Sequence, residues 1–264
     1  MPFYDESMVK YHQEILSMTN KLQAVFFDCW DTLLEFHDPD KKWNINSLMK
    51  HAINKNAIHE EDVFRFTDDF FQKYYRSHLD YELTILQILR LVQEHFHIRL
   101  DCPLETCTHE ILSYLAPKQV DGADDFLKFL EERHIPYGCL TNTVYPKEDT
   151  AQLLRRFYPE RTFALVLASG EVGVKKPNPV FFETGVEMLQ KNIGSCMYVG
   201  DKLLQDAYGS FKAGFAISCF LDWKKEKEKQ IHTMGKLSIS TDFPYLEVDG
   251  YPSLKEYIIH HELA

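Results

Sequence analysis

The stretch FFDCWDTLL, residues 26–34, completes an apolar run that begins at Leu22 and then changes to polar residues. The run has the almost wholly apolar composition of a strand that is buried on both faces of a parallel sheet. Asp28 and Asp31 come directly after it, separated by a cysteine and Trp30. The stretch therefore predicts a buried strand that ends in a loop with two carboxylates and an indole between them.

Further apolar runs predict the rest of the sheet. They occupy residues 135–140, 163–168, 196–199 and 215–221. Helical spacing of apolar residues recurs between them, at 121–134, 179–192 and 203–214, and the last of these segments closes on Gly214, a typical helix end. Because strands alternate with helices, we expect an α/β fold with a Rossmann-like parallel sheet flanked by helices on both faces.

The interval from residue 37 to residue 119 contains no strand-like run. Its helical periods lie at 45–55, 60–75, 81–96 and 105–115. The strongest, YELTILQILRLVQEHF, places its apolar residues along one broad face. We therefore expect an inserted, all-helical cap domain at 37–119 and an α/β catalytic core formed by 1–36 and 120–264.

Charge and composition restrict the possible partners. The 264-residue chain has a formal net charge of −11, which argues against a nucleic-acid surface. No apolar run approaches the ~20 residues of a membrane helix, and we expect no signal peptide. The six cysteines form no C-x-x-C pair and are expected to be buried free thiols. We expect a cytoplasmic protein with a small-molecule partner, and neither a nucleic-acid nor a membrane partner.

Polar groups follow the predicted strands at the edge where open α/β sheets bind ligands. In chain order they are Asp28, Thr141, Asn142, Lys175, Lys176, Asp201 and Asp206. Each alone has an ordinary explanation as a turn or a helix cap. Together, the carboxylates could hold Mg²⁺ and supply a nucleophile. Thr141, Asn142 and Lys176 are the predicted substrate-binding residues, because their polar groups could contact phosphate oxygens.

Longer stretches around these residues resemble a known family. AVFFDCWDTLL, YGCLTN, GVKKPNPVFF and YVGDKLLQDAYGSFKAGF are similar to motifs of the haloacid dehalogenase-like hydrolase superfamily, in the branch with a helical cap after the first strand. The last stretch is the most specific of the four. The resemblance spans Lys21 to about His260, and it implies a Mg²⁺-dependent hydrolase.

The resemblance also implies a role for each matching residue. Asp28 matches the nucleophile, which forms a covalent aspartyl intermediate with the substrate. Thr141 would hydrogen-bond the phosphoryl group, and Lys176 would neutralise it. The implied metal ligands are Asp28, Asp201, the backbone carbonyl of Trp30 and, in a supporting position, Asp206. The scheme is physically reasonable because a dianionic phosphate cannot approach a carboxylate until cations offset their repulsion.

Trp30 departs from the family pattern. Phosphatases of this superfamily usually carry a second aspartate there, which protonates the leaving group and later deprotonates the attacking water. An indole can do neither, and loss of a general acid–base typically costs ~10²–10⁴ in rate. Asp31 is not an automatic substitute, because adjacent side chains normally point in different directions. We expect a phosphatase of a small phosphorylated metabolite, through an aspartyl-phosphate at Asp28, that is limited to good leaving groups.

Alternative interpretations of Trp30 stay open. A dehalogenase-like enzyme expels a halide and needs no proton donor, although the retained acid Asp201 disfavours metal-free chemistry. A phosphonatase-like enzyme would need a Schiff-base lysine from the cap, for which the candidates are Lys41, Lys42, Lys50, Lys55 and Lys73. A catalytically weak, phosphate-binding pseudo-hydrolase is the third alternative.

Overall fold

The computed structural model describes residues 21–36, 43–76 and 81–264 of the chain. Six parallel strands form one sheet in the order β5-β4-β1-β6-β7-β8. Their bounds are β1 (Ala24–Phe27), β4 (Tyr137–Thr141), β5 (Leu165–Ala168), β6 (Cys196–Gly200), β7 (Ile217–Leu221) and β8 (Leu246–Val248). The chain adds β4 and β5 on one side of β1 and then β6 to β8 on the other. The order therefore reverses at β1, which is where α/β sheets form their binding crevice.

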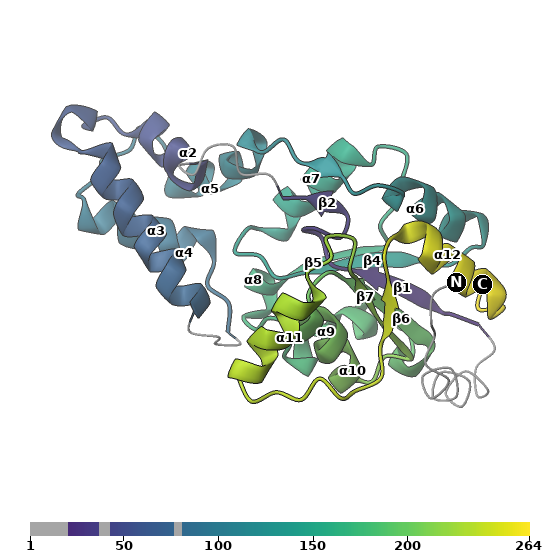
Figure 1. The fold of residues 1–264 in the computed structure, drawn as a ribbon. Helices are drawn as coiled ribbons and strands as arrows, with labels where there is room; N and C mark the ends of the chain where they lie inside the picture. Colours follow the sequence, from purple (N-terminus) through teal and green to yellow (C-terminus); the bar gives the residue numbers. More distant parts are fainter. Residues whose placement is uncertain (1–20, 37–42, 77–80) are drawn as a thin grey trace.

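Helices cover both faces of this sheet (Figure 1). Their bounds are α6 (Ala123–Glu132), α7 (Lys147–Phe157), α8 (Ser169–Val172), α9 (Pro179–Met188), α10 (Gly209–Ala213), α11 (Lys227–Lys236) and α12 (Tyr251–His260), with shorter turns η3 (Ile193–Ser195) and η4 (Leu203–Tyr208). Side chains alternate between the faces of a strand. Accordingly, Val25 and Phe27 of β1 pack with α6 and α12, whereas Phe26 packs on the other face with α9.

A helical segment, residues 43–114, lies to one side of the sheet and is linked to it through a short antiparallel pair, β2 (Leu34–Glu35) and β3 (Lys118–Gln119) (Figure 1). It comprises α2 (Trp43–His51), η1 (Lys55–Ala57), α3 (Glu60–Arg76), α4 (Ile85–His95), α5 (Leu104–Glu110) and η2 (Ile111–Tyr114). These helices bury a cluster of their own, which includes Leu48, Val63 and Leu89. The segment therefore has its own apolar core beside that of the sheet.

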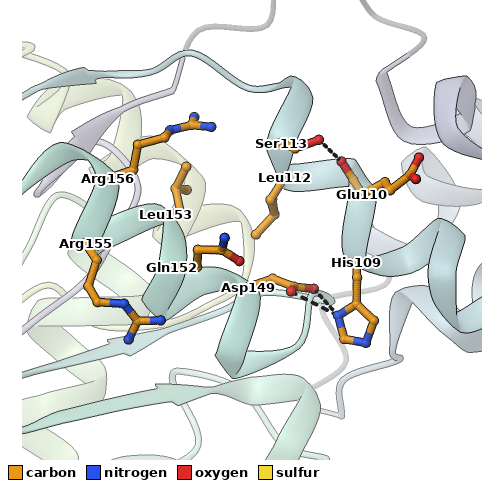
Figure 2. A pocket seen from close by; sticks show the side chains of 9 residues that line it. All are labelled: His109, Glu110, Leu112, Ser113, Asp149, Gln152, Leu153, Arg155 and Arg156. Atoms are coloured by element: carbon orange, nitrogen blue, oxygen red, sulfur yellow. Dashed lines mark hydrogen bonds and ion pairs between the residues drawn. The ribbon is translucent and has the colours of Figure 1, made fainter.

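Polar contacts of side chains and backbone fix the helical segment against the sheet, near α4 and near α5. Near α4, the Ser169 hydroxyl donates to Glu82 Oε2 at 2.7 Å, and both residues are buried. Near α5, His109 Nδ1 lies 2.9 Å from the buried carboxylate of Asp149 on α7, beside a cavity of about 440 Å³ (Figure 2). Each of these two side-chain contacts joins a residue of the segment to an element of the sheet region.

The fold class predicted from the sequence is confirmed. All five predicted strands are present with ends shifted by at most two residues, and Gly214 ends α10 at a φ of 92°. The four helical periods between 43 and 114 correspond to α2, α3, α4 and α5 with η2. The sequence reading missed β8, a three-residue edge strand whose central Glu247 is exposed. It also expected no strand within 37–119, whereas β3 lies at Lys118–Gln119, two exposed polar residues that carry no apolar pattern. No helix in the described ranges is both long enough and apolar enough to cross a bilayer.

Candidate active site

Lys176 lies at the centre of the polar groups beside β1, where the strand order of the sheet reverses. Its ammonium donates to Asp28 Oδ1 at 2.8 Å, to Asp206 Oδ1 at 2.7 Å and to the hydroxyl of Tyr198 at 2.7 Å. All four residues are buried. The ammonium has three hydrogens to donate, and each has an acceptor. The lysine is therefore held in one position, directly against the carboxylate that follows β1.

The backbone around Lys176 is positioned by Asn142, which follows β4. The Asn142 amide nitrogen donates to the Lys176 carbonyl at 3.0 Å, and its oxygen accepts from the Lys176 backbone N–H at 2.8 Å. Both polar groups of this side chain are thus engaged with the loop that carries the lysine. Asn142 also lines the adjacent cavity, and its contact with a substrate stays a prediction.

Asp206 is placed by the tight turn that follows β6. The strand ends at Gly200, and a Cβ at that position would lie 2.2 Å from Asp206 Cγ, so only glycine leaves room for the carboxylate. Asp206 Oδ2 accepts from the Lys202 backbone N–H at 2.9 Å, while Oδ1 faces Lys176. The π-helical turn η4 carries this residue, and such turns are frequent at functional sites. Both Asp206 oxygens are engaged, one of them by the lysine.

Three buried carboxylates meet at this point. One oxygen from each of Asp28, Asp201 and Asp206 lies within 4.8 Å of the others. Within the described part of the chain, Asp201 Oδ1 is buried without a hydrogen-bond partner, although Oδ2 is paired with the ammonium of Lys202. An unsatisfied buried carboxylate oxygen is costly unless a ligand engages it. The donor set consists of hard oxygen atoms, which fits Mg²⁺.

The protonation of these groups follows from burial and charge. Burial raises the pKa of Asp28, and the ammonium of Lys176 only partly opposes this effect. Burial likewise raises the pKa of Asp201, to about 7. For Lys176, burial alone would lower the pKa, but the carboxylates of Asp206 and Asp28 raise it above its usual range. The lysine is therefore a permanent cation, whereas the Asp201 carboxyl titrates near neutral pH without a metal.

Thr141, the last residue of β4, is fully buried. Among the described residues, no hydrogen-bond partner lies within reach of its hydroxyl oxygen. A buried hydroxyl without a partner is unfavourable, so a ligand oxygen at this position would relieve a cost that the protein already bears. The hydroxyl does not line the adjacent cavity directly, and its contact with substrate stays a prediction.

Trp30 and Asp31, neighbours in the loop after β1, have different surroundings. Trp30 is half-buried, lines the cavity and packs edge-to-face on Phe36 with ring centroids 5.4 Å apart. Asp31 adopts a left-handed φ of 57°, and its carboxylate pairs with Lys224 at 2.6 Å and accepts from the Phe36 N–H at 3.0 Å. Asp31 is therefore committed to an ion pair, although it also borders the cavity.

A cavity of about 500 Å³ opens beside this group of residues. Its walls include Asp28, Lys176 and Asp206 from the strand ends, together with Glu82 from the helical segment. Glu82 Oε1 lies 4.0 Å from the ammonium of Lys175, which also borders the cavity. The cavity therefore lies over the strand ends, and Glu82 is the residue of the helical segment that lines it.

The structure brings together most of the residues that the sequence predicted. Asp28, Lys176, Asp201 and Asp206 form one buried network, and Asn142 supports it. The sequence reading missed Tyr198, whose hydroxyl donates to the Leu140 carbonyl at 2.9 Å and accepts from the lysine. It also missed Glu82. For Tyr198, the sequence offers one signal, a tyrosine within an otherwise apolar strand. For Glu82 it offers no signal, because the residues that Glu82 contacts are distant in the sequence.

Comparison with known proteins agrees with this geometry. The sequence profile of the haloacid dehalogenase-like hydrolases matches residues 22–214. A curated relative, the glyceraldehyde 3-phosphate phosphatase of Methanopyrus kandleri, is 26% identical over 197 residues, which cover 73% of this chain and 81% of the relative.

Solved structures share the fold. The 2-haloacid dehalogenase of Pseudomonas syringae pv. tomato has a TM-score of 0.60 at 17% identity, over 90% of this chain and 99% of that one. The HAD-hydrolase YfnB of Bacillus subtilis, bound to magnesium, has a TM-score of 0.58 at 18% identity, over 90% and 99%. These similarities extend over the helical segment as well as the sheet region.

Proposed function

Because the chain belongs to the haloacid dehalogenase-like hydrolases, we propose that it is a Mg²⁺-dependent phosphatase of a small phosphorylated metabolite. One observation carries the proposal. The carboxylate of Asp28, directly after β1, shares a buried site with a permanent cation, Lys176, and with a second carboxylate, Asp201, whose buried Oδ1 lacks a partner among the described residues. The curated phosphatase relative supports a phosphate ester as the substrate class.

In this proposal Asp28 is the nucleophile. One of its oxygens attacks phosphorus, the bond from phosphorus to the leaving oxygen breaks, and an aspartyl-phosphate forms, which water then hydrolyses. Lys176 offsets the negative charge of the incoming phosphate, and its contact with Asp206 keeps the ammonium in place. Thr141 contributes its unpartnered hydroxyl to the phosphoryl oxygens. Tyr198 and Asn142 position Lys176.

Asp28 and Asp201 would hold the Mg²⁺ ion, with the Trp30 carbonyl as a further ligand and Asp206 in support. When bound, Mg²⁺ reduces the charge repulsion between the phosphate and the carboxylate nucleophile. The site suits this ion because its donors are buried oxygen atoms that already lie within 4.8 Å of one another. A metal-free dehalogenase would have no use for Asp201, so this cluster favours the phosphatase over the dehalogenase alternative.

The helical segment is proposed to act as the cap, within a domain at 37–119. Its Glu82 borders the cavity and so contributes to the choice of substrate. A phosphonatase would need a cap lysine in the cavity. Within the described ranges, the cavity lining contains no lysine from the segment; Lys50 pairs instead with Glu110 at 2.9 Å. Lys41 and Lys42 lie outside the described residues. Of the candidates that the structure describes, Lys50, Lys55 and Lys73 do not border the cavity, so these three lysines give the phosphonatase alternative no support.

Trp30 places a limit on the substrate. Because it supplies no proton, and because the carboxylate of Asp31 at the edge of the cavity is paired with Lys224, the leaving group departs as an anion. We expect phosphate esters of acidic alcohols, aryl phosphates or acyl phosphates to be hydrolysed much faster than simple alkyl phosphates.

A phosphatase panel tests the proposal. The wild-type protein is incubated with aryl, acyl and alkyl phosphates, one phosphonate and one haloacid, with Mg²⁺ and with a chelator. We expect Mg²⁺-dependent release of phosphate that falls steeply as the leaving group becomes less acidic, and loss of on the order of 10⁴-fold or more in Asp28→Asn. The matched control is Asp125→Asn, an exposed residue of α6. Undiminished turnover in Asp28→Asn would remove this mechanism.

A further inference from the structure

A second group of possible ligands lies within the helical segment, where the end of α2 meets the loop before α5. Backbone hydrogen bonds join the two: the Asp101 N–H donates to the His51 carbonyl at 3.1 Å, and the Ile53 N–H donates to the Arg99 carbonyl at 2.8 Å. Ala52 and Leu100 form an isolated antiparallel bridge between them. The two pieces of chain are therefore held at a fixed separation, and none of these residues borders the catalytic cavity.

Three different donor types converge at this junction. His51 Nδ1 lies 2.8 Å from Asp101 Oδ1, and one donor atom from each of His51, Asp101 and Cys102 lies within 4.8 Å of the other two. Around a tetrahedral Zn²⁺ ion, bonds of ~2.0–2.3 Å place neighbouring donors roughly 3.3–3.8 Å apart. One donor from each residue already lies within 4.8 Å of the other two, which is close to the spacing that such an ion requires.

The imidazole of His51 is oriented as metal-bound imidazoles usually are. Its other nitrogen, Nε2, lies 3.2 Å from Glu110 Oε1, and Glu110 is itself paired with Lys50 at 2.9 Å. Figure 2 shows the Glu110 carboxylate pointing away from α7, although Glu110 also lines the cavity beside His109. Metal-binding histidines almost always place a carboxylate or carbonyl on the nitrogen that is not bound to the metal. Nδ1 faces Asp101 Oδ1 at 2.8 Å, and in the proposed site both atoms turn to the ion in place of this direct contact.

We propose that His51, Asp101 and Cys102 form a second metal site, selective for Zn²⁺ or a similar borderline-soft ion. Imidazole, carboxylate and thiolate together favour zinc over magnesium, which prefers oxygen ligands alone. The Asp101 side chain is 57% exposed, so the fourth position is open to water. The ion connects α2 to the loop before α5 and stabilises the helical segment. This site is independent of the proposed phosphatase function.

Cobalt binding tests the site in the full-length protein. The reduced protein is kept in excess Mg²⁺, which occupies the carboxylate site, and is titrated with Co²⁺ as a spectroscopic probe. We expect one equivalent to bind with the visible bands of tetrahedral cobalt and a near-ultraviolet thiolate-to-cobalt band, and Zn²⁺ to displace it. The cluster of Asp28, Asp201 and Asp206 provides only oxygen atoms, so a thiolate band distinguishes the two sites.

Matched variants identify the ligands. Cys102→Ser should abolish the thiolate band, and His51→Ala should weaken binding at least tenfold; Glu110→Gln should weaken it by roughly 10–100-fold. His59→Ala, an exposed histidine of the same segment, should bind like the wild type. Circular dichroism of each variant reports its fold, and the near-isosteric Cys102→Ser suffices if His51→Ala does not fold.

Two outcomes would overturn the proposal. One is that the metal does not bind as proposed: the wild-type protein binds no Co²⁺ or Zn²⁺ beyond its carboxylate site, or the thiolate band persists in Cys102→Ser.

The other outcome concerns Cys107, whose sulfur lies 3.9 Å from that of Cys102. If these two thiols form a disulfide and the fully reduced protein still shows no zinc-dependent rise in melting temperature, the cysteines act as a redox pair instead.

Discussion

The charged pairs at the strand ends of the sheet are buried, whereas the pair of His51 and Asp101 in the helical segment is partly exposed. At the strand ends, Lys176, Asp28 and Asp206 are all buried, and each is fixed by partners from different strands. In the helical segment, His51 and Asp101 also pair, but the carboxylate is largely exposed. Burial strengthens electrostatic interactions and makes an unpaired charge costly. The comparison teaches that single substitutions at the strand ends should have large effects, and those in the helical segment smaller ones.

Lys176→Met should have the largest effect. It leaves two buried carboxylates without their cation, so we expect a loss of about 3–5 kcal/mol in the free energy of unfolding at pH 7 without metal. Phosphatase activity should fall by on the order of 10³-fold or more, because the repulsion of the phosphate is no longer offset. Denaturant unfolding and steady-state kinetics measure both, with the exposed Lys212→Met of α10 as control. Wild-type stability in Lys176→Met would show that the buried network is not electrostatically coupled.

Trp30→Asp tests the strand-end chemistry from the opposite direction, by adding the acid that the loop lacks. Turnover of an alkyl phosphate should rise relative to an aryl phosphate by about 10–100-fold, because the new carboxylic acid protonates the leaving oxygen. Trp30→Asn is the matched control, since it has nearly the same shape without a titrating proton. Equal alkyl-to-aryl ratios in the wild type, Trp30→Asp and Trp30→Asn would indicate that another group already supplies the proton.

The pH dependence of stability should distinguish the buried carboxylates from exposed ones. Burial raises the pKa of Asp201 in the folded, metal-free protein from 3.8 to about 7. Between these values the folded state keeps a proton that the unfolded state has lost, so this group makes stability fall as pH rises, by at most ~1.4 kcal/mol per pH unit.

Chelator-treated wild type and Asp201→Asn should therefore differ in their pH profiles. The stability of the wild type relative to Asp201→Asn should decline from about pH 4 to about pH 7 and then level off. Mg²⁺ should stabilise the wild type more at pH 8 than at pH 5.5, because the ion binds the deprotonated carboxylate. Thermal unfolding across this range provides the measurement, and parallel profiles would mean that Asp201 is ionised throughout.

Glu82→Gln should have the smallest effect, although it joins the two regions. The amide can still accept from Ser169, but the charge beside Lys175 is lost, so we expect a destabilisation of roughly 1–2 kcal/mol. The Michaelis constant should change more than the turnover number, because Glu82 borders the cavity without contacting the nucleophile's partners. Exposed Glu94→Gln on α4 is the control. A collapse of turnover in Glu82→Gln would assign this carboxylate a part in the chemistry.

The sequence was most informative where apolar periodicity and strand ends coincide. The apolar runs predicted β1, β4, β5, β6 and β7, because a strand buried on both faces must be apolar throughout. It failed for β8, where three residues with an exposed glutamate at the centre carry too little pattern. Short edge strands depend on a neighbour for their hydrogen bonds, which local sequence does not show.

The strand-end residues were predictable for a similar reason, since parallel strands bring their carboxyl ends to one edge. Asp28, Lys176 and Asp206 therefore met as expected. Residue spacing does not fix side-chain directions. It therefore could not predict that Asp31 forms an ion pair with Lys224, or that Asn142 hydrogen-bonds the Lys176 backbone. The same holds for Glu82, which reaches Ser169 across 87 residues of chain.

Diffraction from crystals grown with Mn²⁺ tests the central claim most directly. Manganese replaces magnesium at oxygen sites and gives an anomalous signal that locates it without reference to the protein. We predict a single strong peak at the strand ends, within coordination distance of both Asp28 and Asp201, and its absence in crystals of Asp201→Asn. A peak that touches only one of these carboxylates, or none at this edge of the sheet, would contradict the proposed site.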